Sequence, residues 1–585
     1  MSSFVAFALL TSAAAQTGQL AGPVVRPAPQ TVLDGFGIKQ ATLQDLSIPG
    51  SLVAGFELVV DFDGKAYQLV LREHDIRAAD FKLIASGKNG MKVLPTPASS
   101  TYRGVVAGHA DSQVAASLIG GQLTAFVRLA GLTTPWSVQA LSKLVPTANR
   151  ATYVVHNGRD VKPSRHRCGV DHTVPAPVSP GRPKSSGNGP IYECELALDL
   201  DFDEYKKHGS DTIATQYDAT SIINACNVIY SRDVEVEFLL TTIIVRTSQV
   251  YSSSNYNTLL SDYRSRWRSN HSGVRRDVTH LLTGKFTTSG VIGVAYLRSI
   301  CSTRNGYGLS FTHFSNDFQQ RVGLTAHELG HSFGANHCDT ASGGCFIMCS
   351  NLYGCNGSLT MFGSASKSAI ISYRNGRSCL RQKSGNEPRL DSVSPGTVQA
   401  FRGGTVTLTG INFTGATQVT VGDTVLTPGT DPRTSFRIVS DTSITFEAPT
   451  GASYAPHAVY IQNAAGFSGR LHLRYSVTNP RKLDVEALLR RGGSANWEFG
   501  AGARHSWILT VSPSPSTYRF LGLTWLQSPL ILIGGTLDRA GTGSSKVTVP
   551  NNAPIGLTFY SQVVTINPFK NKFGGNTNVT TSRIQ

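Results

Sequence analysis

A chain of 585 residues is too long to fold around one hydrophobic core, so roughly three to five domains are expected. Charged residues make up only 15% and there are 58 glycines, a composition that favours a secreted, strand-rich protein over a helical cytosolic one. The net charge of +16 is spread along the chain without a basic face bearing aromatic platforms, which argues against nucleic-acid binding. No stretch reaches the roughly 18–20 apolar residues that a transmembrane helix needs.

The first residues, 1–15, have the pattern of a secretion signal peptide. Phe4 to Leu10 is apolar, and Ala13 to Ala15 offers a cleavage site of small residues before Gln16. The basic stretch that usually opens such a signal is missing, so a frayed terminus is the alternative. We expect a secreted, extracellular protein that is released or only peripherally attached to a surface.

Residues 16–172 are predicted to form a β-rich region that ends close to a single cysteine, Cys168. Short β-like runs lie at 56–62, 67–71, 102–112, 114–117 and 121–123. A cysteine thiolate is a strong zinc ligand. Residues 173–190 are rich in Pro, Gly and Ser and are predicted to be a linker. Arg182 and Lys184 make this linker a plausible site for proteolysis, by autolysis or by another protease.

Residues 191–383 are predicted to form an α/β domain, because strand-like and helix-like patterns alternate there. Strands are expected at 196–200, 234–245, 277–284, 291–297 and 307–311, and helices at 212–231, 256–267 and 366–375.

The strongest functional motif of the chain is His327-Glu328-Leu329-Gly330-His331-Ser332-Phe333-Gly334-Ala335-Asn336-His337. On a helix, His327 and His331 lie one turn apart on one face and can bind one Zn²⁺. Gly334 allows the left-handed turn that ends a helix, which lets His337 return as a third ligand. The fourth position stays open, as in catalytic zinc sites, and Glu328 lies where a general base for a bound water is needed. The alternative is a buried helix with incidental histidines.

This motif resembles the signature of the metzincin metallopeptidases, H-E-x-x-H-x-x-G-x-x-H followed by a Met-turn. The segment Cys345-Phe346-Ile347-Met348-Cys349 is the candidate Met-turn, and Met348 would form the floor beneath the zinc ligands. The order of elements across 191–383 resembles the adamalysin (reprolysin, ADAM-like) catalytic domain. That resemblance implies one catalytic Zn²⁺ and protein or peptide substrates. It also implies that substrate lies antiparallel to an edge strand, expected at Tyr307 to Phe311.

The resemblance extends to the region before the linker. Tyr102 to Ser112 matches a Tyr-x-Gly-x-Val-x-Gly-x-x-x-Ser segment of adamalysin propeptides, although a generic β-domain is the alternative. The segment Arg167-Cys168-Gly169-Val170-Asp171 resembles a metzincin cysteine switch, in which the thiol is the fourth zinc ligand of a latent precursor. One departure is that Cys338 follows His337, where adamalysins usually have Asp.

Cysteine counting supports the switch interpretation. There are nine cysteines, and the eight after the linker could form four disulfides and leave Cys168 unpaired. By resemblance to the family, Cys301 with Cys379 is the expected pairing, and the others stay open.

After Cys379 the chain has no cysteine and reads as two further β-rich domains. Residues 387–478 contain alternating segments at 389–396, 405–413 and 443–449 that resemble an IPT/TIG immunoglobulin-like domain; an unrelated β-sandwich is the alternative. Residues 485–585 have similar runs at 506–511, 528–533 and 557–564, which predict another β-sandwich-like domain. Binding of protein or surface glycan is the expectation for both.

The sequence as a whole thus predicts a multidomain secreted zinc endopeptidase with a β-rich prodomain, made as a zymogen that Cys168 keeps latent. A structural Ca²⁺ is compatible with such a chain, but no motif places one. The alternative is a non-catalytic extracellular adhesion or binding protein that keeps a metzincin scaffold. Against it, all three histidines and Glu328 are present.

Overall fold

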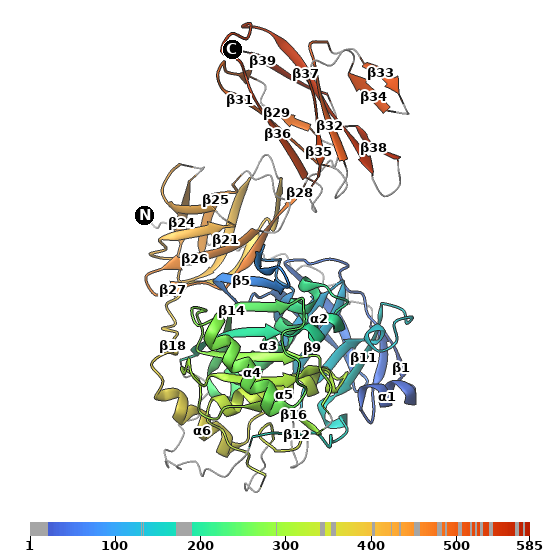
Figure 1. Cartoon of the computed structure of the whole chain (residues 1–585), viewed down its shortest axis with the longest axis vertical. Helices are drawn as coiled ribbons and strands as arrows, with labels where there is room; N and C mark the ends of the chain where they lie inside the picture. Colours follow the sequence, from blue (N-terminus) through green and yellow to red (C-terminus); the bar gives the residue numbers. More distant parts are fainter. Residues whose placement is uncertain are drawn as a thin grey trace, which may run out of the picture.

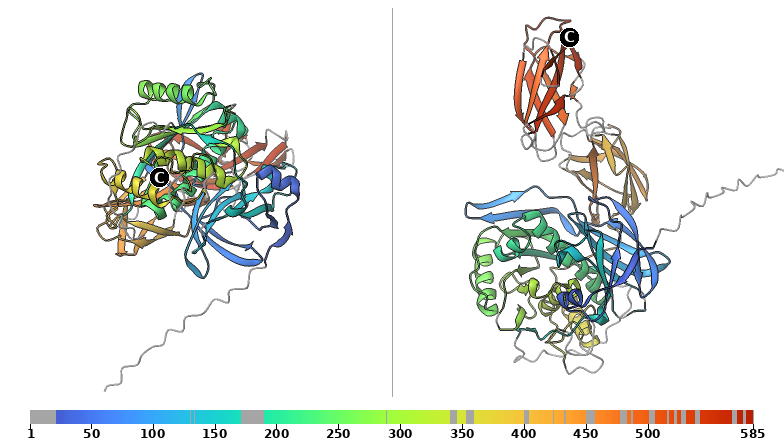
Figure 2. Two further views of the ribbon diagram at one scale, coloured as in Figure 1. Left: turned by 90° about the horizontal axis from the view of Figure 1, so that it is seen from below. Right: turned by 90° about the vertical axis from the view of Figure 1, so that its right-hand side faces the viewer.

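The computed structural model divides the chain into four strand-rich regions, shown in Figures 1 and 2. It describes residues 22–129, 131–132, 134–170, 190–287, 289–339, 346–352, 359–399, 404–422, 424–431, 434–449, 457–476, 483–485, 488–500, 506–514, 517–520, 523–526, 531–537, 542–567, 572–576 and 579–584. The predicted signal peptide and nearly all of the predicted linker lie outside these ranges, as do Cys345 and Cys355. Among the described residues, no helix combines the length and apolarity needed to cross a membrane.

Residues 22–170, called here the N-terminal segment, build most of their structure around one nine-stranded sheet in the order β1-β2-β11-β10-β9-β8-β7-β4-β3. Its elements are β1 (Val24–Pro27), α1 (Gln30–Phe36), β2 (Thr42–Asp45), β3 (Gly55–Phe62), β4 (Lys65–Glu73), β7 (Thr101–Val106), β8 (His109–Ile119), β9 (Gln122–Arg128), β10 (Trp136–Ala140), η1 (Leu141–Lys143), β11 (Thr152–Asn157) and η2 (Gly158–Asp160). Buried side chains alternate along strands such as β3, so one face carries a hydrophobic core of its own.

A second sheet runs in the order β12-β16-β17-β15-β13-β14-β5-β6, with β18 paired to β13. Its strands are β5 (Arg77–Gly87), β6 (Gly90–Leu94), β12 (Arg167–Cys168), β13 (Tyr192–Leu200), β14 (Val236–Arg246), β15 (Val278–Thr283), β16 (Val291–Ala295), β17 (Tyr307–Phe311) and β18 (Arg381–Gln382). The helices around it are α2 (Phe202–Lys207), α3 (Thr212–Val234), α4 (Tyr256–Asn270), η3 (Thr312–Phe314), α5 (Phe318–Ser332) and α6 (Ser364–Asn375). The helices and strands expected between 196 and 375 are present, with bounds that differ by a few residues, whereas α2 and η3 were not expected.

The N-terminal segment contributes strands to both ends of this second sheet. The hairpin β5–β6 adds to β14, with β5 parallel to it and Leu83 opposite Ile243. At the other end, β12 pairs with β16. Leu83 is fully buried in the same hydrophobic cluster as residues of β13, α3 and α5. The part of the chain from β13 to β18 is called here the central region, and the N-terminal segment is thus part of its core.

The strand order corrects one expectation. Tyr307 to Phe311 was expected to be the edge strand, but β17 lies between β15 and β16, parallel to β15 and antiparallel to β16. Without the N-terminal segment the edge on this side would be β16. The expectation failed because strands that follow one another in sequence need not follow one another in the sheet. No local sequence pattern shows which of β16 and β17 lies at the edge.

Helix α5, which carries the metal motif, has well-defined ends. The side chain of Asp317 accepts a hydrogen bond from the backbone N–H of Gln320 and caps the first turn. The helix ends at Ser332, and Gly334 has a φ of +91°, the left-handed conformation expected from the sequence.

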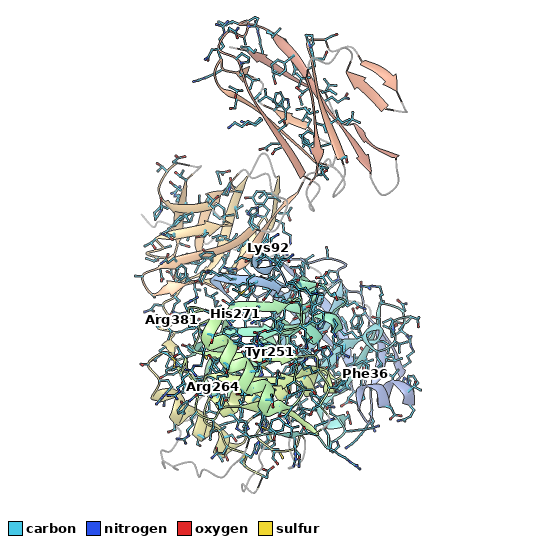
Figure 3. All side chains as sticks on the ribbon, in the orientation of Figure 1. Phe36, Lys92, Tyr251, Arg264, His271 and Arg381 are labelled. Carbon is cyan, nitrogen blue, oxygen red and sulfur yellow. A yellow bond between two sulfur atoms is a disulfide. The ribbon has the colours of Figure 1, made fainter. Side chains whose placement is uncertain are left out.

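Helix α4 is connected to the sheet by hydrogen bonds to a buried carboxylate, that of Asp199 in β13. Asp199 accepts hydrogen bonds from Arg246 (2.6 Å), Tyr251 (2.8 Å) and Trp267 (2.7 Å). Arg246 also contacts His271 at 3.0 Å, and Figure 3 labels Tyr251 and His271 beside this helix. A buried charge paired and hydrogen-bonded in this way avoids the cost of an unsatisfied one.

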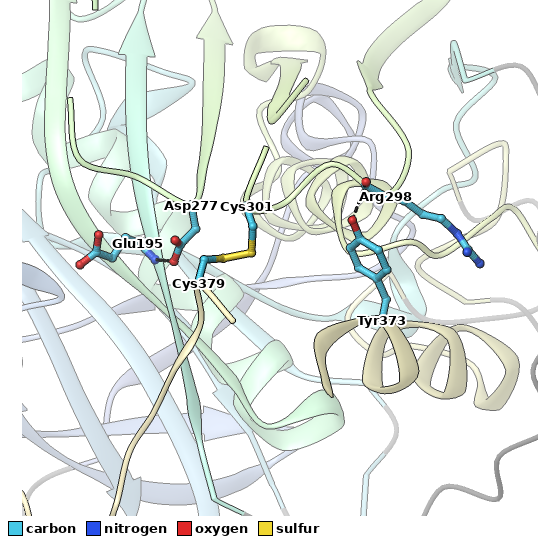
Figure 4. Close-up of a disulfide and its surroundings, with 6 residues drawn as sticks. All are labelled: Glu195, Asp277, Arg298, Cys301, Tyr373 and Cys379. Carbon is cyan, nitrogen blue, oxygen red and sulfur yellow. Dashed lines mark hydrogen bonds between the residues drawn. A yellow bond between two sulfur atoms is a disulfide. The ribbon is translucent and has the colours of Figure 1, made fainter. Parts of the chain in front are cut away.

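The expected disulfide between Cys301 and Cys379 is present and links two segments 78 residues apart. Figure 4 shows it beside Asp277, whose carboxylate accepts a hydrogen bond from the backbone N–H of Glu195 at 2.8 Å. In the same figure the Tyr373 hydroxyl donates to the carbonyl of Arg298, which holds α6 close to the disulfide.

The expectation that all eight later cysteines form disulfides is wrong. Cys338 and Cys349 are disulfide-bonded, but Cys194 and Cys226 are free thiols, fully buried in the core of the central region. Buried cysteines can serve as small hydrophobic residues, and counting alone cannot distinguish them from disulfide partners. Cys168 is therefore not the single free thiol of the described chain.

The third region, residues 389–476, is all strand and packs on the N-terminal segment. Its strands are β19 (Arg389–Ser394), β20 (Thr397–Gln399), β21 (Thr405–Ile411), β22 (Gln418–Val421), β23 (Thr424–Pro428), β24 (Ser435–Ser440), β25 (Ser443–Glu447), β26 (His457–Asn463), β27 (Gly466–Phe467) and β28 (Leu471–Ser476). The His472 side chain contacts the carboxylate of Glu73, and both are buried. Arg470 forms a backbone bridge with Asp75.

The last region lies at the far end of the molecule from α6 in Figure 1. Its strands are β29 (Leu483–Val485), β30 (Leu488–Leu489), β31 (Ser494–Gly500), β32 (Ser506–Ser512), β33 (Thr517–Phe520), β34 (Leu523–Leu526), β35 (Ile531–Thr536), β36 (Thr542–Thr548), β37 (Thr558–Asn567), β38 (Lys572–Asn576) and β39 (Thr580–Ile584). It has a separate hydrophobic core around Trp497 and Leu509.

Candidate metal centre

The three histidines of the motif converge at the C-terminal half of α5. His327 and His331 are one turn apart on the helix, and His337 returns after the turn at Gly334. Their Nε2 atoms are 3.0 Å (His327 to His331) and 3.2 Å (each of these to His337) apart. Together with the Cys168 Sγ atom, the ligand atoms lie within 4.8 Å of one another.

The hydrogen bonds of the rings indicate that this arrangement fits a cation. His327 Nδ1 lies 2.6 Å from the carbonyl of Ile347, and His331 Nδ1 lies 2.7 Å from the carbonyl of Ala335. A carbonyl only accepts, so Nδ1 carries the proton and Nε2 keeps its lone pair when the ring is neutral. Lone pairs directed at one another across about 3 Å repel, and a divalent cation between them removes this repulsion. Such a set of imidazoles, with an optional thiolate, is typical of zinc.

Glu328 lies beside this centre and is fully buried. Its Oε1 atom makes no hydrogen bond to any described residue, and burial raises the pKa of the carboxyl well above its usual value. A buried carboxylate oxygen without a hydrogen bond destabilises a fold. A group that is kept in such a position is therefore a candidate functional residue.

Cys168 occupies the open side of the centre. Its Sγ atom lies 3.5 Å from His331 Nε2 and 3.6 Å from Glu328 Oε2. Burial, followed by the charge of Glu328, raises the pKa of the thiol well above its usual value. A cation bound by the histidines would act in the opposite direction and favour the thiolate.

Backbone hydrogen bonds hold Cys168 in this position. The N–H of Arg167 donates to Gly290 O (2.9 Å), and the N–H of Gly169 donates to Gly293 O (2.8 Å). The Cys168 N–H itself donates to Ser350 O at 2.9 Å. The thiol is thus positioned by strand pairing with β16 on one side and by the segment after Met348 on the other.

Met348, the candidate Met-turn residue, packs against Gly330 of α5, which directly precedes His331 in the sequence. It is fully buried, and a Cβ atom on Gly330 would lie only 2.7 Å from its Sδ atom. The preceding residue, Ile347, supplies the carbonyl that orients His327. Next to His337, where the usual Asp is replaced, Cys338 is disulfide-bonded and the carboxylate of Asp339 instead accepts from the Ser350 N–H at 2.9 Å.

Two glycines that the sequence interpretation missed shape this centre. A Cβ on Gly293 of β16 would lie 2.2 Å from Glu328 Oε1, so only glycine leaves room for the carboxylate there. Gly330 has the corresponding role against Met348. Both glycines lie inside a regular helix or strand, where glycine is unfavourable. This unusual placement is the feature of the sequence that could have identified them.

Comparison with known proteins agrees with this geometry. Residues 192–373 match the family model "Metallo-peptidase family M12", Reprolysin_5, and residues 388–475 match the IPT/TIG domain model. Human "Disintegrin and metalloproteinase domain-containing protein 19" is 27% identical over 222 residues, which is 34% of this chain and 23% of the relative. The chain therefore spans about a quarter of the length of that relative.

"Snake venom metalloproteinase trimerelysin-2" from Protobothrops flavoviridis is 28% identical over 149 residues, 25% of this chain and 73% of the relative. A solved structure, "Structure of a chaperone-substrate complex", has a TM-score of 0.24 and 16% identity over 31% of this chain and 37% of its own, a similarity too low to support a conclusion about the fold. The matches to the family models cover the metal centre and the region after it. The chain contains a metallopeptidase domain of the M12 reprolysin type, followed by an IPT/TIG domain.

Proposed function

We propose that this protein is a secreted zinc-dependent endopeptidase made as a latent zymogen, with Cys168 blocking the metal centre. The observation that carries the proposal is the convergence of His327, His331, His337 and Cys168 within 4.8 Å, beside a buried Glu328. The M12 family match supports zinc as the cofactor and proteins as substrates.

When bound, zinc supplies a Lewis acid that polarises a carbonyl and lowers the pKa of a water. The chain itself contributes the proton transfers. Glu328 accepts a proton from the attacking water and returns it to the leaving amine. Glu328 is fully buried beside the ligands, so its carboxylate is held close to the position that the attacking water would occupy. His327 and His331 are held in orientation by the carbonyls of Ile347 and Ala335.

Latency in this proposal has two components. The thiol of Cys168 occupies the position that water and substrate need. In addition, β12 pairs with β16, so the N-terminal segment covers the edge to which an extended substrate would add. β12 runs parallel to β16, whereas the family resemblance implies a substrate antiparallel to its edge strand. The N-terminal segment therefore pairs with this edge in the opposite direction to a substrate.

The proposed domain organisation follows from this function. Residues 1–15 are the signal peptide, 16–172 the propeptide and 173–190 the linker, whose cleavage begins an activation that is complete when the propeptide dissociates. Residues 191–383 form the α/β catalytic domain, 387–478 the TIG domain and 485–585 a β-sandwich-like domain. The last two are proposed to bind protein or surface glycan.

Replacing the base without disturbing the ligands tests the mechanism. Glu328→Gln should retain zinc, because the three histidines remain, but lose hydrolysis of casein or gelatin by the 191–585 fragment. Wild-type cleavage should stop with a chelator and return with Zn²⁺. Unimpaired turnover by Glu328→Gln would refute the assigned role. Absence of cleavage by the wild-type fragment, with zinc bound, would favour the non-catalytic binding protein.

A further inference from the structure

A second group of metal-ligating side chains lies outside the catalytic centre. It comprises Glu204 of α2, His208 at the end of that helix, and His313 of η3. The Glu204 side chain is 1% exposed, whereas His208 and His313 are 16% and 21% exposed. One carboxylate is therefore buried at the base of a cluster that solvent can reach through the two imidazoles.

The two imidazoles are directed at the same oxygen atom. Glu204 Oε1 lies 3.1 Å from His208 Nε2 and 3.2 Å from His313 Nε2. These separations match the 3.0–3.2 Å between the Nε2 atoms of the catalytic histidines. Ligands of a tetrahedral zinc, each about 2.0–2.2 Å from the metal, are about 3.3 Å apart. The two separations between Nε2 and Oε1 are thus close to those between the ligands of a metal site, and all three ligand atoms lie within 4.8 Å of one another.

The other oxygen of the carboxylate is already fixed by the chain. Thr312 donates its hydroxyl to Glu204 Oε2 at 2.6 Å, and Arg321 Nε donates to the Thr312 carbonyl at 3.0 Å. Arg321 also pairs with Asp218, whose Oδ2 atom lies 3.6 Å from His208 Nε2. Glu204 is therefore oriented by surrounding contacts in the way that the ligands of established metal sites are.

We propose that Glu204, His208 and His313 form a second site for a divalent transition-metal ion, with Zn²⁺ the best match to two imidazoles and a carboxylate. The ion would link α2 to η3, the short segment directly before α5. It would thereby stabilise the entry to the helix that carries the catalytic motif. The proposal does not depend on peptidase activity.

Metal content of the full-length chain measures this directly. After equilibration with Zn²⁺ and removal of excess, mass spectrometry should find about two zinc ions per wild-type chain and about one in Glu204→Gln. This substitution keeps the size of the side chain and an oxygen for the Thr312 hydroxyl, but removes the anionic ligand. His313→Asn should act likewise, whereas His109→Asn in the N-terminal segment should leave the content unchanged.

A catalytic-site knockout separates the two sites. In a His327→Ala/His331→Ala variant, added Zn²⁺ should still raise the thermal midpoint above its value in chelator, and adding Glu204→Gln should abolish that rise, measured against the chelator value of the same triple variant. The result that overturns the proposal is a wild-type chain with about one zinc, lost entirely in the His327→Ala/His331→Ala variant. The cluster would then be only a hydrogen-bonded group.

Discussion

The hairpin β5–β6 should keep the N-terminal segment attached to the metallopeptidase domain even after the linker is cut. Leu83 of β5 is fully buried in the core cluster that contains β13, α3 and α5, not in the separate core of the N-terminal sheet. Replacing a buried leucine with alanine typically costs about 2–5 kcal/mol. Since about 1.4 kcal/mol corresponds to a factor of ten, Leu83→Ala should weaken retention by roughly 30-fold to several-thousand-fold.

The assay uses a full-length chain with a specific protease site placed in the linker, cut under native conditions. In the wild type the two pieces should co-elute on gel filtration, and in Leu83→Ala they should separate at the same concentration. Val93→Ala on the neighbouring strand β6 is the matched control, because Val93 is 62% exposed and its loss should change little. If Leu83→Ala and the wild type dissociated equally, the hairpin would not be what retains the segment.

Three further outcomes follow from contacts around the metal centre. Cys168→Ser should raise peptide hydrolysis by the uncleaved precursor, because a hydroxyl is a weaker zinc ligand than a thiolate; a fluorogenic peptide measures this. Gly293→Ala should lower hydrolysis about tenfold or more while zinc content stays unchanged, since its Cβ would lie 2.2 Å from Glu328 Oε1. His156→Gln should destabilise the full-length chain at about pH 6 much more than at about pH 9, as measured by thermal melting. It breaks a buried pair with Asp317 at 2.8 Å, a change that typically costs about 3–5 kcal/mol.

The sign of the pH effect follows from the pKa of His156. Burial lowers it, but the charge of Asp317 and its hydrogen bond outweigh burial and leave the pKa raised. The stabilisation is therefore complete below the usual pKa of about 6.5 and is lost as pH rises through the raised value. A gap between wild type and variant that widened with pH would contradict this assignment.

Matched controls exist for each of these variants. Arg165→Ala changes an exposed residue near Cys168 and should leave the precursor latent. Gly273→Ala introduces a Cβ with no atom within 4 Å and should keep activity. Arg159→Gln breaks an exposed pair with Asp63, which is expected to contribute about 0–1 kcal/mol.

Local patterns predicted the parts of the molecule that depend on neighbours in sequence. The spacing of His327, His331 and His337 needs only a helix and a glycine turn, and the structure brings the three side chains together. The disulfide from Cys301 to Cys379 was accessible only through the family resemblance.

Long-range arrangements had no such signal. Nothing in Arg77 to Gly87 indicates that this strand joins β14, because parallel pairing between distant segments leaves no periodicity of its own. The order of β16 and β17 was missed for the same reason. The count of cysteines failed because Cys194 and Cys226 fill space in a core, a role that their number does not reveal.

The contact between the TIG domain and the N-terminal segment makes the accessory domain dependent on the part of the chain that maturation would remove. The side chains of Arg470 and His472 are now covered, 5% and 2% exposed, with Glu73 as the anionic partner of the histidine. Departure of the N-terminal segment would expose the Arg470 guanidinium and the His472 imidazole to solvent. Dissociation of the N-terminal segment, and not cleavage of the linker alone, would then set both the reach of the accessory domain and the charge that it presents to its surroundings.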